Sequence, residues 1–338
     1  MASYKDIQQR TGLSLATISK HFNGGAVRPE NARMIQEAAK DLGFRINDMA
    51  RSLRRGSSRT VGILLPVLDN PFILAIIDGV ERRLQAGGVG VLICSSHPSG
   101  RADGGAVEAL RAKTVDGILA VPSPHDLEGL SDAQDAGIPV VTVDHDLDGL
   151  ECDHVQLDNQ TAGAMAAHHL IDHGHRRIAF IGGDEALSSL AERYRGFERA
   201  LRSRGVAVEE RWVSRSEISF EAGSRAMRDL LAQDERPSAV FAANYDLTIG
   251  ALMTLNDFGL DIPADMSFLG FDVPDIARVT RPRVTTLVQP MRLIAEHAAD
   301  LLLARLGDGA ADAPRRMTVP VDLASGGSVG APAPIPGS

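Results

Sequence analysis

The sequence predicts an α/β protein in which a small all-α N-terminal domain precedes a body of two Rossmann-like subdomains with parallel sheets. Two observations predict it: helical spacing within the first 46 residues, and apolar β-rich runs that alternate with helical segments from about residue 61. With 338 residues and 44% hydrophobic content, the chain is long enough for two or three domains with substantial cores.

The N-terminal segment has the features of three short helices. They are expected over residues 4–10, 14–22 and 29–42. Gly12 supplies the positive φ that a sharp helix-to-helix turn requires, and Ser14 is a good N-cap for the second helix. Pro29 stands at an early helical position, where its missing N–H has little effect. Ile7, Leu13 and Ile18 are spaced to pack the first two helices together.

The body has the alternation that is typical of βαβ units. Its apolar runs are TVGILLP, GVGVLICS, VDGILAVPS, IPVVTVD, HVQLD, RRIAFIGG, SAVFAAN and MSFLGFD, and helical segments separate them. Continuous apolar strands between helices predict parallel sheets that are covered on both faces. Two such series begin, at Val61 and near Arg177, and they predict two subdomains.

The net charge of −9 is divided unevenly along the chain. Residues 1–60 hold 11 Lys or Arg against 5 Asp or Glu, a net charge of +6, so the remaining 24 basic and 39 acidic residues carry −15. A basic head on an acidic body suits contact with the phosphates of a nucleic acid through the head alone. An ordinary basic surface patch is the alternative that charge alone leaves open.

The composition argues against a secreted or membrane-spanning protein. There are two cysteines, Cys94 and Cys152, and the N-terminal sequence MASYKDIQQR lacks the apolar stretch of a signal peptide. No run approaches the roughly 20 consecutive apolar residues that a membrane-spanning helix needs. We therefore expect a reduced, cytoplasmic protein without membrane contact.

Two long runs resemble a known family. YKDIQQRTGLSLATISKHFNGG and the following VRPENARMIQEAAKDLGFRINDMARSLRRGSSRTVGILLP are similar to the helix-turn-helix and hinge of the lactose-repressor (LacI-type) family of bacterial transcriptional regulators. In the body, LDNPF, DNQTAGAMAAHHLIDHGHRRIAFIGG and IPADMSFLGFD resemble the periplasmic-binding-protein-like core of that family. The resemblance implies that the two subdomains enclose a ligand cleft.

The resemblance implies a DNA-reading role for the second helix. Leu15, Ala16 and Lys20 would face base edges in the major groove, with Lys20 as the reader of guanine. The other side chains expected to contact DNA, of which the last three would bind phosphates and set the register, are Tyr4, Thr17, Ser19 and Asn23. An alternative for Leu15 is a place in the core of the head, because it alternates with Ile18.

Residues 47–60 resemble the family's hinge helix and linker. Leu53 would insert between base pairs in the minor groove, and Arg51 and Arg54 would bind the flanking phosphates. The Arg, Ser and Gly composition by itself favours a plain linker instead. The resemblance favours the hinge.

The expected domain organisation follows from the same resemblance. The segments are a helix-turn-helix domain over 1–46, the hinge and linker over 47–60, an effector-binding and dimerisation domain over 61–325, and a disordered Gly/Pro/Ser-rich tail over 326–338. The N-subdomain would comprise 61–158 and 290–316, and the C-subdomain 159–289 and 317–325. The chain would cross between them near 158–161, near 287–290 and near Met317.

The effector pocket is expected at the strand ends that face the cleft. Its residues would be Asn70, Phe72, Asp144, Ser189, Arg193, Asn244, Tyr245 and Asp272. Carboxylates, an amide and a guanidinium together suit a sugar or polyol. Two alternatives remain: Asp144 and Asp272 could cap turns, and Arg193 could pair with Glu192 or Glu198 on a helix surface.

The resemblance implies a ligand-responsive regulator, a repressor that binds a pseudo-palindromic operator as a homodimer and that a small effector releases or retains. A solute-binding protein and a nucleotide-dependent α/β enzyme are the rival classes. Neither a G-x-G-x-x-G nor a P-loop is present, so no enzyme activity, catalytic residue or cofactor is expected. The cluster His168, His169, His173 and His175 suggests a metal site, but no Cys or acidic partner completes a tetrahedral set, and none is expected.

Overall fold

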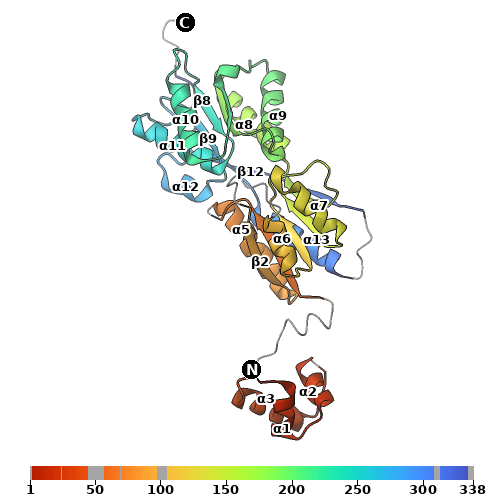
Figure 1. Ribbon diagram of the computed structural model, residues 1–338. Coiled ribbons are helices and arrows are strands. Elements are labelled where there is room, and N and C mark those ends of the chain that lie inside the picture. Colours follow the sequence, from red (N-terminus) through yellow and green to blue (C-terminus); the bar gives the residue numbers. More distant parts are fainter. Residues whose placement is uncertain are drawn as a thin grey trace. The chain divides into compact units, whose positions relative to one another are not determined.

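The computed structural model describes residues 2–23, 25–44, 57–68, 70–96, 105–307 and 313–333 (Figure 1). It divides into two compact units, Met1–Ser58 and Arg59–Ser338, and each is described by itself. We call the first unit the head and the second the body. The expected hinge residues Arg51, Leu53 and Arg54 lie outside the described residues.

The head contains three helices, as expected: α1 (Tyr4–Thr11), α2 (Leu15–Phe22) and α3 (Pro29–Asp41). The turn between α1 and α2 depends on Gly12, whose φ is +70° and whose N–H bonds to the Gln8 carbonyl. The Ser14 hydroxyl accepts a hydrogen bond from the Thr17 N–H and so caps α2. Pro29 occupies the first turn of α3, as expected for a residue that lacks an N–H.

A small apolar core holds the three helices together. Ile7, Ile18 and Ile35 are fully buried, one from each helix. Beside them the rings of Tyr4 and Phe22 stack with centroids 5.6 Å apart. Because each helix contributes one buried isoleucine, the orientation of α2 is set by packing against both of its neighbours.

The body contains two six-stranded sheets with the same kind of strand order. The first sheet, which defines the N-lobe, runs in the order β11 (Arg316–Val319), β5 (Asp153–Leu157), β4 (Val140–Val143), β3 (Gly117–Ala120), β1 (Thr60–Leu65) and β2 (Gly90–Ser95). The second, which defines the C-lobe, runs in the order β12 (Asp322–Ala324), β10 (Thr285–Val288), β9 (Ser267–Phe271), β8 (Ala239–Ala242), β6 (Ile178–Gly183) and β7 (Val213–Ser216). All pairings are parallel except that of β10 with β12.

Helices cover the sheets of both lobes. In the N-lobe they are α5 (Pro71–Ala86), α6 (Gly105–Ala112), the short η1 (Pro124–Asp126), α7 (Leu127–Asp135) and α13 (Met291–Leu306). In the C-lobe they are α8 (Asn159–Asp172), α9 (Ser188–Ser203), the short η2 (Glu210–Trp212), α10 (Phe220–Leu231), α11 (Tyr245–Asp257) and α12 (Pro274–Val279). Figure 1 shows α8 and α9 side by side on the C-lobe, with α11 beside β8 and β9. The expected α/β architecture is therefore confirmed.

The chain crosses between the lobes three times. It leaves β5 for α8 at Asp158 and leaves β10 for α13 at residues 289–290, close to the positions expected. The third crossing, expected near Met317, was placed wrongly: Met317 lies in β11, paired with Val155 of the N-lobe sheet, and the chain crosses at residues 320–321 instead. The half-exposed edge strand β11 has no continuous apolar run to reveal it.

The disordered tail expected over 326–338 is wrong for residues 326–333. Ser328 is fully buried; its hydroxyl donates to the Phe268 carbonyl at 2.5 Å and accepts from the Thr285 N–H at 2.7 Å. The Ser328 carbonyl also accepts from the Phe268 N–H at 2.8 Å. Small and polar residues allow this segment to lie against the ends of β9 and β10 and to satisfy their backbone groups.

Ser328→Ala should therefore destabilise the C-lobe, because it leaves the buried Thr285 N–H and Phe268 carbonyl without their hydroxyl partner. A loss of about 2 kcal/mol is expected, measured by denaturant unfolding. The control is Ser325→Ala, since Ser325 is exposed in the same segment. Equal stability of the two variants would contradict the anchoring of this segment.

Candidate ligand cleft and nucleic-acid interface

The residues of α2 expected to read bases all lie on its outer face. Leu15 is 38% exposed, and Ala16 and Lys20 are exposed, whereas Ile18 points into the core of the head. The alternative that Leu15 is a core residue is therefore wrong. An exposed apolar side chain, a methyl group and an ammonium on one short helix are the kinds of groups that contact thymine methyls and guanine in the major groove.

The other polar residues expected to contact DNA lie along α2 and at its end. The Thr17 hydroxyl lies 2.9 Å from the Ser14 hydroxyl, and the Asn23 amide donates to the Ser19 hydroxyl at 3.1 Å. Tyr4 is half-buried against Phe22, so its ring supports α2 from behind. The structure thus describes seven of the ten residues that were expected to contact DNA. All seven lie in α2, at its end or against it.

In the body, one cavity between the lobes brings together all eight residues expected for the effector pocket. Its lining contains Asn70, Phe72, Asp144, Ser189, Arg193, Asn244, Tyr245 and Asp272. Five lining residues were not among those expected: His145, Leu190, Ile218, Phe271 and Gln289. His145 adjoins an expected site residue, and Phe271 and Gln289 flank strand ends, so proximity to those ends was the available signal.

Asp144 and Asp272 occupy corresponding places, directly after β4 and β9. Both have a left-handed backbone, with φ of +69° and +57°. The Asp144 N–H bonds to the Val155 carbonyl and the Asp272 N–H to the Leu287 carbonyl, so each residue still holds the neighbouring strand. A left-handed non-glycine residue is uncommon and typically costs on the order of 1 kcal/mol or more, and such residues cluster at functional sites.

Two asparagines begin the helices that point into the cleft. The Asn70 side chain accepts from the Phe72 N–H at the start of α5, and the Asn244 side chain accepts from the Asp246 N–H at the start of α11. The Asn70 amide also donates to the Asp246 carboxylate at 3.2 Å, which links the two lobes. Capping thus fixes both amides at the rim of the cavity.

Arg193 fills the centre of the cleft. It is 2% exposed, its guanidinium donates to the Asn159 side chain at 2.6 Å and to the Ala243 carbonyl, and its Cζ lies 3.6 Å from the Phe271 ring centroid. The alternative that Arg193 pairs with Glu192 or Glu198 on the helix surface is therefore wrong. Burial lowers the pKa of Arg193 to about 10, although Asp144 and Asp272 act in the opposite direction.

Asp272 is the second buried charge of the cleft. Its carboxylate accepts from the Gln289 N–H at 3.0 Å and from the Gln289 side-chain amide, so it caps no helix. Burial raises the pKa of Asp272 to about 6, against the opposing effects of the Gln289 donors and of Arg193. The alternative of a turn-capping role is not supported, because Val273 precedes α12 without any side-chain cap.

Polar contacts close the cleft in this conformation. The Ser189 hydroxyl lies 3.0 Å from Nδ1 of His145, and the Ser188 hydroxyl accepts from the Asp146 N–H at 2.8 Å. The free volume of the cavity is only about 40 Å³, whereas ligand pockets typically measure about 300–1,000 Å³. A ligand therefore requires the lobes to separate or Arg193 to move.

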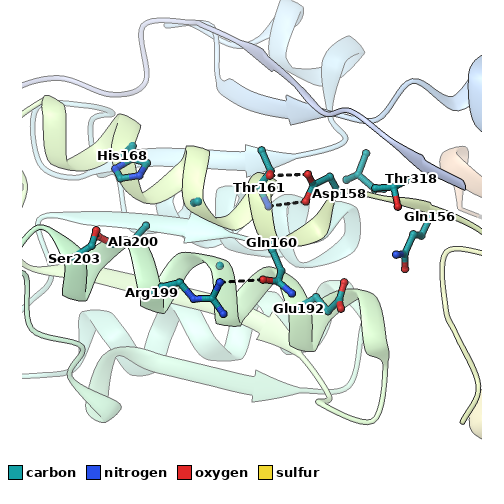
Figure 2. A pocket seen from close by; sticks show the side chains of 13 residues that line it. Gln156, Asp158, Gln160, Thr161, His168, Glu192, Arg199, Ala200, Ser203 and Thr318 are labelled. Carbon is teal, nitrogen blue, oxygen red and sulfur yellow. Dashed lines mark hydrogen bonds between the residues drawn. The ribbon is translucent and has the colours of Figure 1, made fainter. Parts of the chain in front are cut away.

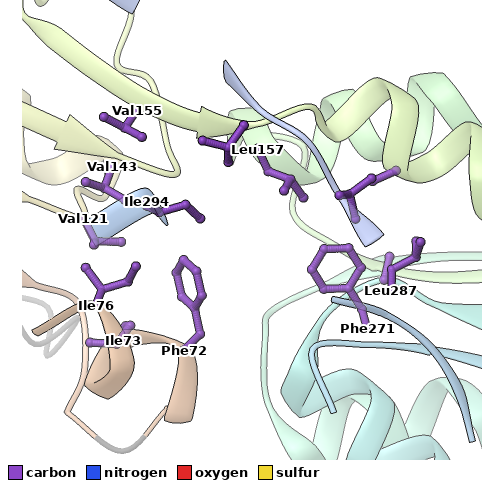
Figure 3. Close-up of a cluster of buried hydrophobic side chains, with 14 of the residues drawn as sticks. Phe72, Ile73, Ile76, Val121, Val143, Val155, Leu157, Phe271, Leu287 and Ile294 are labelled. Carbon is purple, nitrogen blue, oxygen red and sulfur yellow. The ribbon is translucent and has the colours of Figure 1, made fainter. Parts of the chain in front are cut away.

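Apolar side chains continue from one lobe to the other beside the cleft. Figure 3 shows Phe72 on α5 and Phe271 at the end of β9 on the two lobes, with Leu157 near the crossing between them. All three are buried and belong to one hydrophobic cluster. Both aromatic side chains line the cavity, and the Arg193 guanidinium covers one face of the Phe271 ring.

The cluster of His168, His169, His173 and His175, at the end of α8 and after it, does not gather metal ligands in the part of the chain that the structure describes. Both ring nitrogens of His175 have protein partners: Nδ1 lies 2.8 Å from the Ser238 hydroxyl, and Nε2 lies 2.9 Å from the Gly330 carbonyl. His169 and His173 lie one turn apart with ring centroids 4.5 Å apart.

None of the helices described is both long and apolar enough to cross a membrane.

A helix-turn-helix head and a two-lobed, periplasmic-binding-protein-like body define the class of a DNA-binding regulator with a ligand-sensing domain. A family profile for the periplasmic binding protein-like domain matches residues 167–329. The HTH-type transcriptional repressor PurR of Pectobacterium carotovorum subsp. carotovorum (strain PC1) is 32% identical over 316 residues, which cover 93% of each chain. The repressor CytR of Escherichia coli (strain K12) is 31% identical over 306 residues, which cover 90% of each chain.

Solved structures share this fold. The lac repressor dimer bound to operator and the anti-inducer ONPF has a TM-score of 0.86 at 22% identity, covering 98% of this chain and 99% of that one. A complex of the transcriptional regulator CelR with cellobiose has a TM-score of 0.73 at 27% identity, covering 97% and 100%. The chain belongs to the LacI family of transcriptional regulators, which are repressors and not enzymes.

Asp272→Asn should stabilise the protein at pH 7.5 by about 1–3 kcal/mol, because it removes a buried carboxylate whose raised pKa makes the folded state bind its proton more tightly than the unfolded state. The stability of the wild type should fall as the pH rises from about 4 to about 6, and the variant should lack that part of the change. Denaturant unfolding at pH 4.5 and 7.5 measures both.

The control for this variant is Asp275→Asn, since Asp275 is exposed on α12. It should leave the pH profile nearly unchanged. A lower stability of Asp272→Asn at pH 7.5 would mean that attraction to Arg193 outweighs the cost of burying the carboxylate.

Proposed function

We propose that the protein is an effector-responsive repressor that binds a pseudo-palindromic operator as a homodimer and that a sugar or polyol in the cleft controls this binding. It would act in the cytoplasm, at the nucleoid. The observation that carries the proposal is the joint presence of an exposed reading face on α2 and a closed polar cleft between two lobes. The alternative, a solute-binding protein, would leave the basic three-helix head without a function.

The reading face supports major-groove recognition. Lys20 is the long cation on the exposed side of α2, and Leu15 and Ala16 flank it one turn earlier. Because base readout in the major groove depends on side chains from the first turns of such a helix, these three positions would decide sequence preference. The sugar-phosphate backbone of the DNA would be contacted by the hinge residues and by Thr17, Ser19 and Asn23.

Exposed apolar side chains support a dimer. Several lie on outer elements of both lobes: Leu74 on α5 (47% exposed), Ile93 on β2 (39%), Phe220 on α10 (44%), Met253 on α11 (55%) and Val279 on α12 (77%). Where exposed apolar side chains form a contiguous patch, they commonly mark a protein interface. The related lac repressor was solved as a dimer on its operator, and a second copy of this chain is the partner we propose.

The chemistry of the cleft supports a polyhydroxylated effector. Asp144, Asn70 and Asn244 offer acceptors and amide donors at the rim, Arg193 offers a guanidinium at the centre, and the Phe72 ring offers an apolar face. Vicinal hydroxyls match such bidentate donors and acceptors. The CelR complex, 27% identical to this chain, holds cellobiose.

The coupling would be a shift of populations. The closed state depends on contacts such as Asn70 with Asp246 and His145 with Ser189. An effector that binds one arrangement of the lobes better than the other would shift the N-lobes of a dimer relative to each other, and so change whether both heads can engage the operator. Relief of repression by the effector is the direction we propose.

Lys20→Ala should weaken binding to the specific operator about 10-fold to 100-fold while changing binding to random duplex much less, because a base contact is worth about 1–3 kcal/mol. The operator is first obtained by sequencing genomic fragments that the purified protein retains, and affinities are then measured at one fixed salt concentration. Lys40→Ala on the exposed side of α3 is the control. If Lys20→Ala lost the same affinity for operator and for random duplex, base readout would be rejected. If the wild type bound duplexes with one and with two half-sites equally tightly, the dimer would be rejected.

Asp272→Ala should abolish the effect of sugars on operator binding and leave the binding itself in place, since Asp272 lies in the body and not in the head. The probes are a panel of mono- and disaccharides and polyols, cellobiose included, added to a gel-shift assay of the wild type. Any sugar that shifts the wild type but acts equally on the variant would remove Asp272 from the pocket. No response of the wild type to the entire panel would reject the sugar class.

A further inference from the structure

A second hollow, of about 580 Å³, lies on the outside of the C-lobe between α8 and α9 (Figure 2). Its free volume is far larger than the 40 Å³ left in the effector cleft, and it falls within the range of about 300–1,000 Å³ that is usual for small-molecule sites. None of the described residues that line the effector cleft also lines this hollow. The hollow is therefore a separate place for a ligand in this conformation.

The hollow spans the crossing between the lobes. One end is formed by Gln156 of β5 and Thr318 of β11, which are strands of the N-lobe sheet. The rest is formed by α8 and α9 of the C-lobe, with Thr161 and Glu192 nearest to the crossing (Figure 2). A molecule that fills this end would touch both lobes.

Two opposite charges stand along one face of α9. Glu192 and Arg199 are seven residues apart, which is two helical turns and about 10 Å along the axis. Gly196 lies between them and adds no side chain to the hollow. Its backbone approaches the Gln160 carbonyl so closely that a Cβ would lie 2.0 Å from that oxygen. The carboxylate thus lies toward the crossing and the guanidinium toward the far end of the same trough.

The neighbouring polar groups leave these two charges available to a ligand. Asp158 is engaged by Thr161, whose N–H and hydroxyl donate to its carboxylate at 3.0 Å and 2.7 Å. Among the described residues, Arg199 has one side-chain hydrogen bond, of 3.3 Å to the Gln160 amide oxygen, so four of its five guanidinium donors can serve a bound anion. Gln160 lies on the wall between Glu192 and Arg199 and presents its own amide to the trough.

We propose that this hollow is a second ligand site, for a small zwitterion of the amino-acid or short-peptide class. The ammonium group would meet Glu192, and the carboxylate would meet Arg199. Charge-assisted hydrogen bonds at the two ends would provide most of the affinity. A chain of two or three residues, at about 3.3–3.6 Å per residue, is comparable to the roughly 10 Å that separates the two residues along the helix axis. The amide and hydroxyl groups of Gln160 and Thr161 suit its peptide bonds.

The site would be connected to the effector cleft through α9. Glu192 and Arg199 face the hollow, whereas Ser189 and Arg193 of the same helix face the cleft. Asn159, the first residue of α8, holds the Arg193 guanidinium. Occupancy of the hollow would therefore bear on the same helix that closes around the effector.

The test is isothermal titration of the full chain, without DNA or sugar, with triglycine, trialanine and glycylglycine as probes. Acetylated triglycine amide, which lacks both charges, is the matched ligand control. At least one probe should bind, and the blocked peptide should not. Glu192→Gln and Arg199→Gln should each weaken binding about 10-fold or more, as expected for the loss of a charged partner.

Arg195→Gln is the matched protein control, because Arg195 is exposed on α9 but does not line the hollow. Its affinity for the probes should equal that of the wild type. No binding of any of the three probes would overturn the proposal, and so would equal affinities of Glu192→Gln, Arg199→Gln and the wild type. Because neither operator nor sugar is present, these outcomes are distinguishable from failure of the repressor function.

Discussion

The body depends on the burial of one guanidinium between its two lobes. Arg193 is removed from water, and a buried charge is costly unless hydrogen bonds and opposite charges surround it. Asn159, the Ala243 carbonyl and the Phe271 ring hold it, and Asp144 and Asp272 supply the opposing charge from the two sheets. Among the described residues, the hydrogen bonds and the ring contact of Arg193 lie within the C-lobe, and Asp144 adds from the N-lobe a charge that favours the closed state.

Because of this buried charge, a ligand can change the stability of the closed cleft. Arg193 Nε and the Asn159 amide nitrogen are buried without a hydrogen-bond partner among the described residues, and Asp272 has a raised pKa. Unsatisfied polar groups are costly in an interior and favourable for a ligand that can pair with them. A cleft whose buried polar groups are not all paired within the protein can respond to a small molecule, and α9 extends that response to the outer face of the C-lobe.

Much of the fold could be predicted from the sequence, because central parallel strands are buried on both faces and read as continuous apolar runs, as in RRIAFIGG for β6. Four strands have no predicted run. Three of them, β7, β11 and β12, lie at sheet edges and mix polar and half-exposed residues. The fourth, β10, is mostly buried next to the edge strand β12, but half of its residues are threonines. The end of the chain was misjudged for a related reason. Glycine, proline and serine usually indicate disorder, but here Ser328 satisfies backbone groups of two other segments, a contact that composition cannot reveal.

The sequence by itself determined the helices of the head, the two βα series and the polar residues at the strand ends, because periodicity and turn chemistry act over a few neighbouring residues. The tertiary structure decided which of those residues meet. It placed Arg193 inside the cleft instead of on a helix surface, and it brought His145 and Gln289 into the lining. It also opened the hollow beside Glu192 and Arg199, since the distance between segments far apart in the chain depends on how the lobes pack.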